Sequence, residues 1–413
     1  MIKSLKATNF RSLKEANLKF APLTFFYGNN AVGKSSVFYA LNILRNVIQN
    51  SNVPTDSFFN LNYINLGTFK QVAYKHQQSE SMSFSISTKV KNINCNFKLV
   101  LKFNSGELNL EIPEYDLKLS LPVTFPYPSN QQVQSNFTFK GKNYSATWNG
   151  LVAQVTPEVI DPESGEVAKT ATLAINGLAE KIRKIDVIPL KRGFTRPTYG
   201  IIGEGFLTNE DEVASKLAVD AYLDASVSHY LEQIMDRQFR VKVAPGQTQA
   251  SLMTHEKDAT ESYDLVNDGY GVNQLVYLLA KTLNQSYEVI CMEEPEINLH
   301  PGVVRKLPEA LINIAKETKK QILISTHSES LIIAVLSAVA KGEIMKEDVA
   351  FYLTTKNKGI THFEKQEITR DGKVKGGLKS FMTGELEDIK SFLNPVSGQE
   401  PEPLNPEFSE ENS

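Results

Sequence analysis

The spacing of hydrophobic positions changes along the chain, and each change predicts a different kind of secondary structure. Residues 1–27 contain short apolar runs broken by polar turns, which favours strands. From 81 to 155 apolar and polar residues alternate, as in SMSFSISTKV, which is typical of antiparallel strands. Helical spacing dominates EDEVASKLAVDAYLDASVSHYLEQIMDRQ, and FRVKVAP after it favours a strand. From Asp264 helices and apolar strands alternate, which predicts an α/β protein with a parallel sheet.

The composition narrows the classes of protein to consider. The chain has 413 residues, 41% of them hydrophobic and 22% charged, which indicates a soluble globular protein of one elaborate domain or a few lobes. Its 44 Lys and Arg nearly balance its 47 Asp and Glu, so any DNA contact needs a local basic patch. The cysteines, Cys95 and Cys291, are too few for a disulfide framework or a zinc site. Without a membrane-length apolar run or a secretory signal, we expect a cytoplasmic protein that makes no membrane contact.

We expect the chain to consist of a head at residues 1–392 and a disordered acidic tail at 393–413. The tail is rich in Glu and Pro and contains no Lys or Arg, a composition that disfavours a packed core. The head is expected to contain an N-terminal lobe, a β-rich insert, a helical region and a C-terminal lobe, at 1–75, 76–200, 201–262 and 263–392.

The segment GNNAVGKSS joins an apolar strand to a helix and satisfies the pattern GxxxxGK(S/T), beginning at Gly28. Such a loop wraps backbone N–H groups around phosphates, and the helix N-terminus adds the positive end of its dipole. We therefore expect ATP as the ligand, with Lys34 bridging the β- and γ-phosphates and Ser35 binding Mg²⁺. The residues expected around the phosphates are Asn29, Asn30, Ala31, Val32, Gly33, Lys34, Ser35 and Ser36.

Paired carboxylates follow the buried strand predicted at 289–292. In P-loop ATPases, an acid at the tip of such a strand holds Mg²⁺, usually through water. Glu293 is the candidate for that role, and Glu294 is the candidate general base that polarises the attacking water. The alternative is that the two glutamates start a solvated helix, with Pro295 in its first turn.

Two further motifs suit phosphate binding. His327 follows the apolar strand QILIST and is a candidate to bond the γ-phosphate during catalysis, although a lone histidine is more often structural. Gly269 and Gly271 precede a helix expected to begin near Val272, which offers a second anion site for a nucleotide on a neighbouring subunit. An ordinary turn with a helix cap is the alternative for these glycines.

The order of these motifs resembles that of ABC-type ATPase heads in the RecF, SMC and OLD-like branch of AAA-family ATPases. The resemblance runs from IKSLKATNFRSLKEANLKF through DGYGVNQ and EEPEINLHP to STHS, nearly the whole chain. It implies an ABC-type P-loop head with a parallel-core sheet, an N-terminal antiparallel β lobe and a β-rich insert. It also implies a head-to-tail ATP-sandwich dimer, with higher oligomers left open. The residues that it places at the dimer seam are Gly269, Gly271 and Asn273, facing the partner's γ-phosphate, and Leu299 and His300.

The resemblance assigns two further residues and has two departures. Gln71 corresponds to a Q-loop residue near Mg²⁺, and Arg11 to a phosphate contact from the N-terminal strand pair. Asn273 stands where the family commonly has serine, which puts its contact to the partner in question. Glu293 replaces the usual aspartate, a change that still suits magnesium.

A basic segment, DVIPLKRGFTRPTYG, also resembles a loop of this branch. Its Lys191, Arg192 and Arg196 are candidates to contact phosphate, DNA or a partner. A solvated loop without such a contact is the alternative.

The resemblance suggests a slow, partner-regulated ATPase that serves as a sensor or scaffold. Because the sequence after His327 is short for the TOPRIM nuclease domain of OLD enzymes, we expect a separate effector protein, such as a nuclease. Stand-alone ATPases of bacterial antiphage systems such as Septu and PARIS are the analogy, so antiphage defence is the expected role. Two alternatives stay open, a RecF-like clamp on DNA and a scaffold that binds ATP without hydrolysing it.

Overall fold

The computed structural model describes residues 1–128, 130–201, 209–244, 246 and 248–377. The chain divides into two compact units, Met1–Lys375 and Gly376–Ser413. Every element below belongs to the first unit. The tail expected at 393–413 lies outside the described residues.

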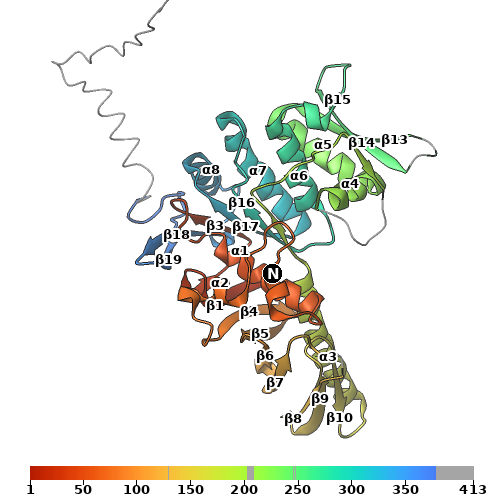
Figure 1. The fold of residues 1–413 in the computed structure, drawn as a ribbon, viewed down its shortest axis with the longest axis vertical. Helices are drawn as coiled ribbons and strands as arrows, with labels where there is room; N and C mark the ends of the chain where they lie inside the picture. Colours follow the sequence, from red (N-terminus) through yellow and green to blue (C-terminus); the bar gives the residue numbers. More distant parts are fainter. Residues whose placement is uncertain (129, 202–208, 245, 247, 378–413) are drawn as a thin grey trace, which may run out of the picture. The chain divides into compact units, whose positions relative to one another are not determined.

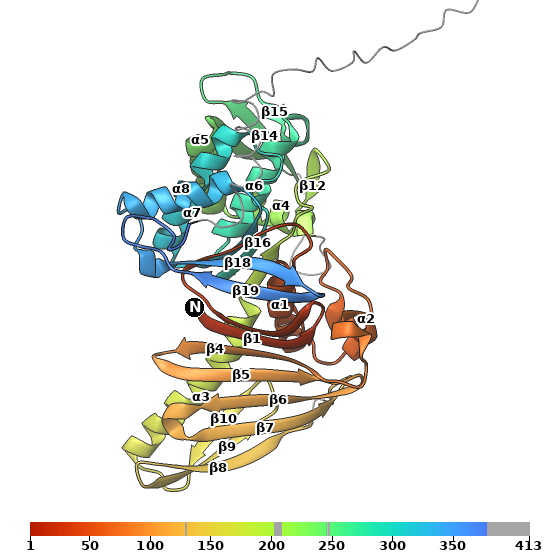
Figure 2. The same ribbon diagram turned by 90° about the vertical axis from the view of Figure 1, so that its left-hand side faces the viewer.

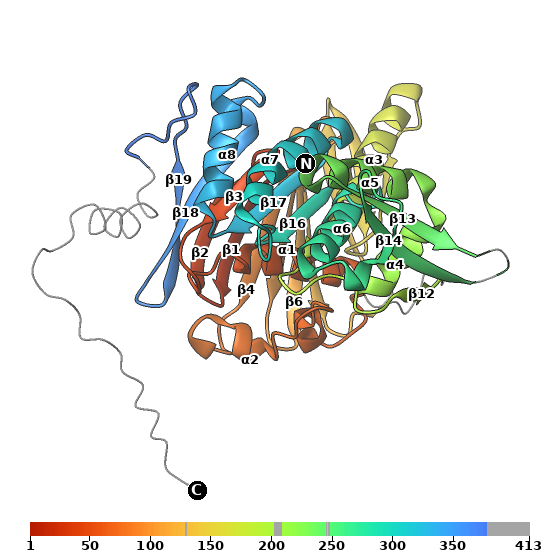
Figure 3. The ribbon, with the colours of Figure 1, turned by 90° about the horizontal axis from the view of Figure 1, so that it is seen from above.

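A six-stranded sheet forms the centre of the first unit. Its strands in spatial order are β11 (Ile185–Ile188), β16 (Val289–Glu293), β17 (Gln321–Thr326), β3 (Leu23–Tyr27), β18 (Val349–Asn357) and β19 (Ile360–Gln366). Only β19 pairs antiparallel with its neighbour, and Figure 3 shows β18, β3, β17 and β16 side by side. Every residue of β3, β16 and β17 is buried, as expected for parallel strands covered on both faces. The predicted parallel core is therefore confirmed.

Helices cover both faces of this central sheet. α1 (Ser36–Gln49) lies on one face, and α7 (Pro301–Thr318) and α8 (Glu329–Ala340) lie on the other (Figures 1 and 2). A further helix, α6 (Tyr270–Leu283), precedes β16 and is buried along almost its whole length. The helices that alternate with the strands along the sequence thus form the two outer layers.

The predicted antiparallel lobe consists of two sheets. The larger has the strand order β2 (Leu13–Lys19), β1 (Ile2–Phe10), β4 (Met82–Val90), β5 (Ile93–Leu101), β6 (Ser105–Ile112) and β7 (Leu117–Thr124). The smaller consists of β10 (Ala153–Pro157), β9 (Lys142–Trp148) and β8 (Val133–Phe139). Buried positions alternate with partly or fully exposed ones along β4 and β7, which matches the period of two in the sequence.

A long helix, α3 (Pro162–Arg183), leads from the antiparallel lobe back to the central sheet. It starts at Asp161, whose carboxylate accepts a hydrogen bond from the backbone N–H of Ser164 at 3.0 Å, with Pro162 in the first turn. The chain then enters β11, which pairs with β16. β11 therefore belongs to the core although it lies within 76–200, the range expected for the insert. Periodicity could not reveal this, since a four-residue apolar strand carries no sign of its partner.

The segment between β11 and α6 mixes helices with strands. It contains α4 (Asn209–Val219), α5 (Ala221–Met235), β12 (Thr198–Gly200), β13 (Arg237–Val243), β14 (Gln249–Glu256) and β15 (Tyr263–Asp264). Asp220 is the N-cap of α5, and its side chain accepts a hydrogen bond from the N–H of Leu223 at 3.1 Å, which separates two helices that share one helical pattern. The range 201–262, expected to be helical, thus also holds an antiparallel hairpin. Within the described residues, no helix is long and apolar enough to cross a membrane.

Candidate functional site

The register of the central sheet gathers the predicted motifs at one edge. Glu293 at the end of β16 pairs with Ser325 of β17, and Thr326 pairs with Tyr27 at the end of β3. The carboxyl ends of these three strands therefore lie together, where ligands bind in open α/β sheets. The glycine loop, the acidic pair and the histidine motif each begin there.

The glycine loop runs from the end of β3 to the start of α1. Gly28 has a φ of 140°, and a Cβ there would collide with the backbone carbonyl oxygen of Thr354 in β18. Gly33 has a φ of 102°, and its Cβ would collide with the hydroxyl of Thr361 in β19. Both positions require glycine because the β18–β19 hairpin packs directly against the loop.

Lys34 is held inside this loop. Its side chain is buried, and Nζ donates hydrogen bonds to the carbonyl oxygens of Gly28 at 2.8 Å and Asn29 at 2.9 Å. Burial lowers the pKa of Lys34, and the carboxylates of Glu294 and Glu296 counter that shift. The lysine charge is thus placed beside the acidic residues at the sheet edge.

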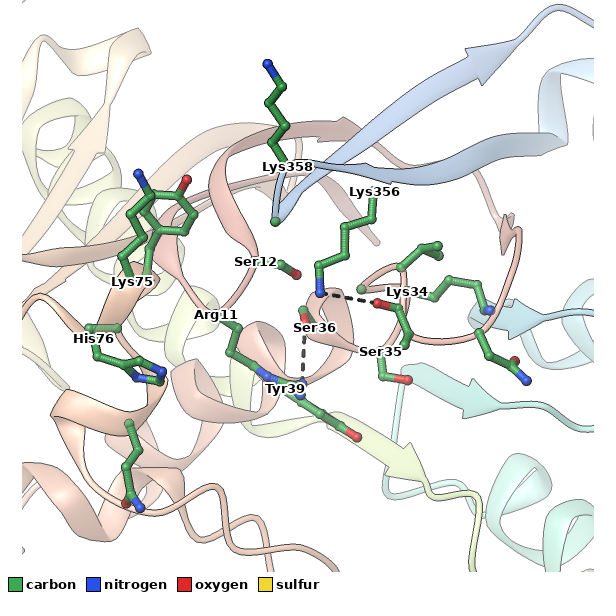
Figure 4. Close-up of a pocket in the computed structure, with 18 of the residues that line it drawn as sticks. Arg11, Ser12, Lys34, Ser35, Ser36, Tyr39, Lys75, His76, Lys356 and Lys358 are labelled. Carbon is green, nitrogen blue, oxygen red and sulfur yellow. Dashed lines mark hydrogen bonds between the residues drawn. The ribbon is translucent and has the colours of Figure 1, made fainter.

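A cavity of about 610 Å³ opens in front of the glycine loop (Figure 4). Its lining includes every residue from Asn30 to Ser36, whereas Asn29 is not among the lining residues. Arg11 also lines it, donates from Nη1 to the hydroxyl of Ser36 at 3.4 Å, and stacks its guanidinium 5.0 Å from the centre of the Tyr39 ring. The structure therefore places Arg11 beside the phosphate-binding loop.

The donor set around Glu293 fits a divalent cation. Glu293 is buried, and its Oε2 accepts a hydrogen bond from the N–H of Leu190 at 3.2 Å, while Oε1 has no hydrogen-bond partner among the described residues. The hydroxyl of Ser325 on the adjacent strand is likewise buried without one. Burial and the neighbouring Glu293 raise the pKa of Tyr39 to about 12, and Ser35 acts on the same hydroxyl. Mg²⁺ held by Ser35 and Glu293 would satisfy the unpaired carboxylate oxygen of Glu293.

Glu294 lines the cavity and turns sharply away from the strand. Its φ is 42°, a left-handed conformation that non-glycine residues rarely adopt. Its Oε2 lies 3.2 Å from Nδ1 of His327. The predicted base and the predicted histidine are therefore in contact, although His327 itself does not line the cavity.

The basic segment before β12 is not a solvated loop throughout. Arg192 is buried, and its guanidinium donates to the carbonyl oxygens of Glu293 at 2.8 Å and Glu294 at 2.9 Å. Burial lowers the pKa of Arg192 to about 10, which leaves it charged at neutral pH. Arg196 instead forms ion pairs with Glu210 and Asp211, and Lys191 is exposed. Arg192 thus supports the backbone of the acidic pair from inside the protein.

Glu296 is a site residue that the sequence reasoning missed. Its Oε1 accepts hydrogen bonds from the hydroxyl of Thr326 at 2.5 Å and the N–H of His327 at 3.2 Å. Burial raises the pKa of this carboxyl group. The available signal was a third glutamate in EEPE, which follows the pair after Pro295. Glu296 ties the segment that carries His327 to the loop that carries Glu294.

Gln71 does not fit the metal role that the resemblance implied. It lines the cavity, but its Oε1 accepts hydrogen bonds from the N–H of Thr68 at 2.7 Å and from the Thr68 hydroxyl at 3.2 Å. This capping box fixes the start of the short helix α2 (Phe69–Val72). The oxygen that would approach Mg²⁺ is thus engaged at a helix cap.

The second glycine-rich segment lies outside the cavity and corrects one expectation. α6 begins at Tyr270, earlier than expected, and its N-cap Gly269 has a φ of 88° with open space where a Cβ would stand. A Cβ at Gly271 would lie 2.8 Å from the carbonyl oxygen of Asn298. Asn273 is buried, and its amide bonds the N–H and C=O of Phe194 at 2.7 and 2.8 Å. Asn273 therefore faces its own chain and not a partner, because its amide matches both backbone groups of Phe194.

The two residues expected at the dimer seam follow the acidic strand. Leu299 is half-buried and His300 is exposed. The Nδ1 of His300 accepts a hydrogen bond from the N–H of Gly302 at 3.2 Å and so caps the start of α7. Because His300 is exposed, this loop presents a side chain at the surface of the protein.

A family model described as AAA ATPase domain matches residues 1–199 and 207–332. The chain belongs to the AAA ATPase domain family. The match includes the glycine loop, the acidic pair and His327, so the predicted AAA-family identity is confirmed. No curated protein matches this AAA ATPase.

Solved structures similar to this AAA ATPase include heads of SMC proteins. One is the SMC head bound to the C-winged helix domain of ScpA, with a TM-score of 0.49, 11% identity, and 88% of this chain and 97% of that chain covered. A second is the SMC head domain from Thermotoga maritima, with a TM-score of 0.43, 10% identity, and coverage of 89% and 99%. A third is the Smc head domain with an extended coiled coil bound to the C-terminal domain of ScpA, derived from Pyrococcus furiosus. Its TM-score is 0.49 and its identity 9%, with 96% of this chain and 99% of that chain covered.

Further basic residues at the cavity of this AAA ATPase were not anticipated. Lys75 and His76 line one wall, and Lys356 and Lys358 come from the β18–β19 hairpin. No sequence motif predicts these positions. The lysines of the hairpin depend on the pairing of β18 with β3, and Lys75 and His76 depend on the turn after α2. Only the folded chain brings them to the phosphate-binding loop.

Proposed function

We propose that this AAA ATPase hydrolyses ATP with Mg²⁺ in the cavity at the carboxyl edge of the central sheet. The observation that carries the proposal is the convergence of three strand ends, which brings Lys34, Glu294 and His327 to one edge. A phosphate-binding loop alone serves many functions. A loop combined with a general-base candidate and a contacting histidine suits hydrolysis.

Each residue has a distinct task in the proposed reaction. The backbone N–H groups of the glycine loop and the Lys34 ammonium hold the phosphates. Ser35 and Glu293 would hold Mg²⁺, which would supply positive charge against the phosphates. The Glu294 carboxylate accepts a proton from the attacking water. In the imidazolium form of His327, Nδ1 bonds Glu294 at 3.2 Å and Nε2 remains available to donate to the γ-phosphate.

The matched test replaces Glu294 with glutamine, which keeps the shape of the side chain and removes the base. We expect phosphate release under saturating ATP to fall at least about a hundredfold, the usual contribution of a general base, with ATP affinity retained. Glu309→Gln on the exposed surface of α7 serves as the control and should match the wild type. Equal, negligible rates in the wild type and Glu294→Gln would refute hydrolysis and favour the ATP-binding scaffold.

We further propose a head-to-tail dimer in which the start of α6 closes on the cavity of a partner. The open space at Gly269 and the exposure of Tyr270 support this arrangement. The backbone of Gly269 and Gly271 is then the contributing group, since Asn273 is turned inward. Light scattering of Glu294→Gln should detect a dimer with ATP and a monomer without nucleotide. A mass independent of ATP would refute the nucleotide-dependent dimer.

The biological role is proposed by analogy with stand-alone antiphage ATPases. In that role the protein is a slow, partner-regulated cytoplasmic sensor or scaffold that controls a separate effector such as a nuclease. Co-purification of the ATP-trapped Glu294→Gln variant with proteins encoded beside its gene tests this role. An effector in the complex would support it. ATP-dependent protection of duplex DNA without any effector would refute it in favour of the RecF-like clamp.

A further inference from the structure

The β18–β19 hairpin is fastened to the phosphate-binding loop. Besides the close approach at Gly28 and Gly33, the hydroxyl of Thr361 donates to the carbonyl oxygen of Val32 at 2.7 Å. The N–H of Thr361 donates to the carbonyl oxygen of Ser12 at 2.9 Å, which adds the β1–β2 turn to the same contact. The tip of the hairpin is therefore held at a defined place over the cavity.

Lys356 uses this position to reach the loop. Its Nζ lies 3.4 Å from the carbonyl oxygen of Ala31, and Figure 4 shows the side chain descending from the hairpin toward the loop. Lys358 follows in a two-residue turn with Gly359, and both have positive φ values of 46° and 81°. In Figure 4 the Lys358 side chain extends away from the loop. Two lysines at one tip thus have opposite orientations.

The opposite wall of the cavity is also basic. Lys75 and His76 line it, and both have left-handed backbones, with φ values of 53° and 58°. Two consecutive non-glycine residues in this region are uncommon, and such strain is concentrated at ligand sites. His76 and Arg11 face the same space as Lys356 (Figure 4).

Four of the cations around this cavity form no salt bridge with a described residue. Within the described part of the chain, none of Arg11, Lys34, Lys75 or Lys356 forms an ion pair, and Glu294, the carboxylate that lines the cavity, contacts His327. Cations that surround one space without forming salt bridges attract an anion and steer it there. The phosphate-binding loop supplies donors on one side only, so a bound phosphate chain would leave its other side to these residues.

We propose that Lys356, with His76 on the opposite wall, binds the phosphate chain of the nucleotide on the side that the glycine loop does not enclose. This inference rests on the proposed ATP site and adds a second cationic half to it. Lys356 is a binding residue in this scheme, and the hairpin positions it. A ligand with more phosphates gains more from this half, since each added phosphate increases the charge that faces Lys356.

Calorimetric titration with ATP, ADP, AMP and inorganic tripolyphosphate tests the proposal on the full chain. Lys356→Gln should weaken ATP and tripolyphosphate binding about tenfold, the scale of one charge-assisted hydrogen bond, and AMP binding much less. Lys356→Arg should restore most of the affinity, which excludes a folding defect. Lys365→Gln, the same charge change at an exposed position of β19 outside the cavity, should change ATP affinity less than about twofold. His76→Gln should weaken ATP binding in the direction of Lys356→Gln.

The possible results separate this inference from the proposed function. If the wild type binds ATP, Lys34→Ala abolishes binding and Lys356→Gln binds like the wild type, the second cationic half is refuted and the ATP site stands. An equal loss for ATP and AMP would also overturn it, because Lys356 would then not sense phosphate. Unchanged ATP affinity with weaker binding of duplex DNA would overturn it in favour of a nucleic-acid contact. A wild type that binds no ATP would refute both proposals.

Discussion

Two glycine-containing loops of this protein begin helices, and they differ in what surrounds them. The loop before α1 is covered by its own chain, since Thr354 and Thr361 of the hairpin occupy the space beside Gly28 and Gly33. The loop before α6 is open, with nothing within 4 Å of a Cβ position at Gly269. The loop before α1 is thus packed against its own chain, whereas the loop before α6 is exposed at Gly269.

This difference indicates where each loop finds its complement. The covered loop packs against β18 and β19, so its backbone conformation is formed before a ligand binds. At the open loop, Gly271 packs against the backbone of Asn298, whereas Gly269 is exposed to solvent. A helix N-terminus that leaves its N–H groups exposed needs a partner for them, which is water or an anion. The proposed dimer would supply that anion from a second copy.

The largest expected effect comes from alanine at the covered glycine. Gly28→Ala adds a Cβ that collides with the Thr354 carbonyl, at a φ that alanine disfavours. We expect a loss of more than about 3 kcal/mol in the free energy of unfolding, together with loss of ATP binding. Urea denaturation followed by circular dichroism measures the first quantity.

Gly269→Ala is the matched change at the open loop. Its φ of 88° is also unfavourable for alanine, but no atom is displaced. We expect a smaller stability loss, intact ATP binding by the monomer and weaker ATP-dependent dimerisation. Equal stability losses at the two glycines would contradict the contrast between a covered and an open loop.

Arg192 connects the two regions, and its replacement should have the next largest effect. Its guanidinium holds the carbonyl oxygens of Glu293 and Glu294, while its own carbonyl oxygen accepts a hydrogen bond from Gln274 of α6 at 3.4 Å. Lysine keeps the charge but cannot reproduce the planar fork of donors. We expect Arg192→Lys to lower kcat about tenfold with little change in ATP affinity, because Glu294 loses its fixed orientation.

Arg196→Lys provides the control for this prediction. Arg196 is half-exposed, pairs with Asp211 and does not contact the acidic strand. Its replacement should leave the ATPase rate within about twofold of the wild type. If the two lysine variants had the same rate, the supporting role of Arg192 would be lost.

The site features that could be predicted from the sequence are those formed by a contiguous motif at the end of a strand. The glycine loop, Glu293 and Glu294, and His327 each follow an apolar strand, and parallel strands bring such ends to one edge. The antiparallel lobe was predictable because its strands alternate strictly. These inferences need no knowledge of which strands are neighbours.

The remaining features depend on long-range pairing and on side-chain direction. Lys356 reaches the loop only because β18 lies beside β3, and neither strand carries a sign of the other. Arg192 and Asn273 are polar residues that favour the surface by type, yet both are buried against backbone groups of distant segments. A sequence pattern shows that a polar group needs a partner but does not show which partner it finds.

Asn273 offers the sharpest test of the inward orientation at the open loop. Serine, the residue that the resembled family commonly has there, is too short to bond both backbone groups of Phe194 at 2.7 and 2.8 Å. We expect Asn273→Ser to lower the free energy of unfolding by about 1–3 kcal/mol, since it leaves a buried group unpaired. ATP-dependent dimerisation should remain, because the backbone of Gly269 and Gly271 is unchanged. Unchanged stability combined with an altered dimer affinity would instead mean that Asn273 contacts the partner, and the open loop would then recognise its partner through a side chain.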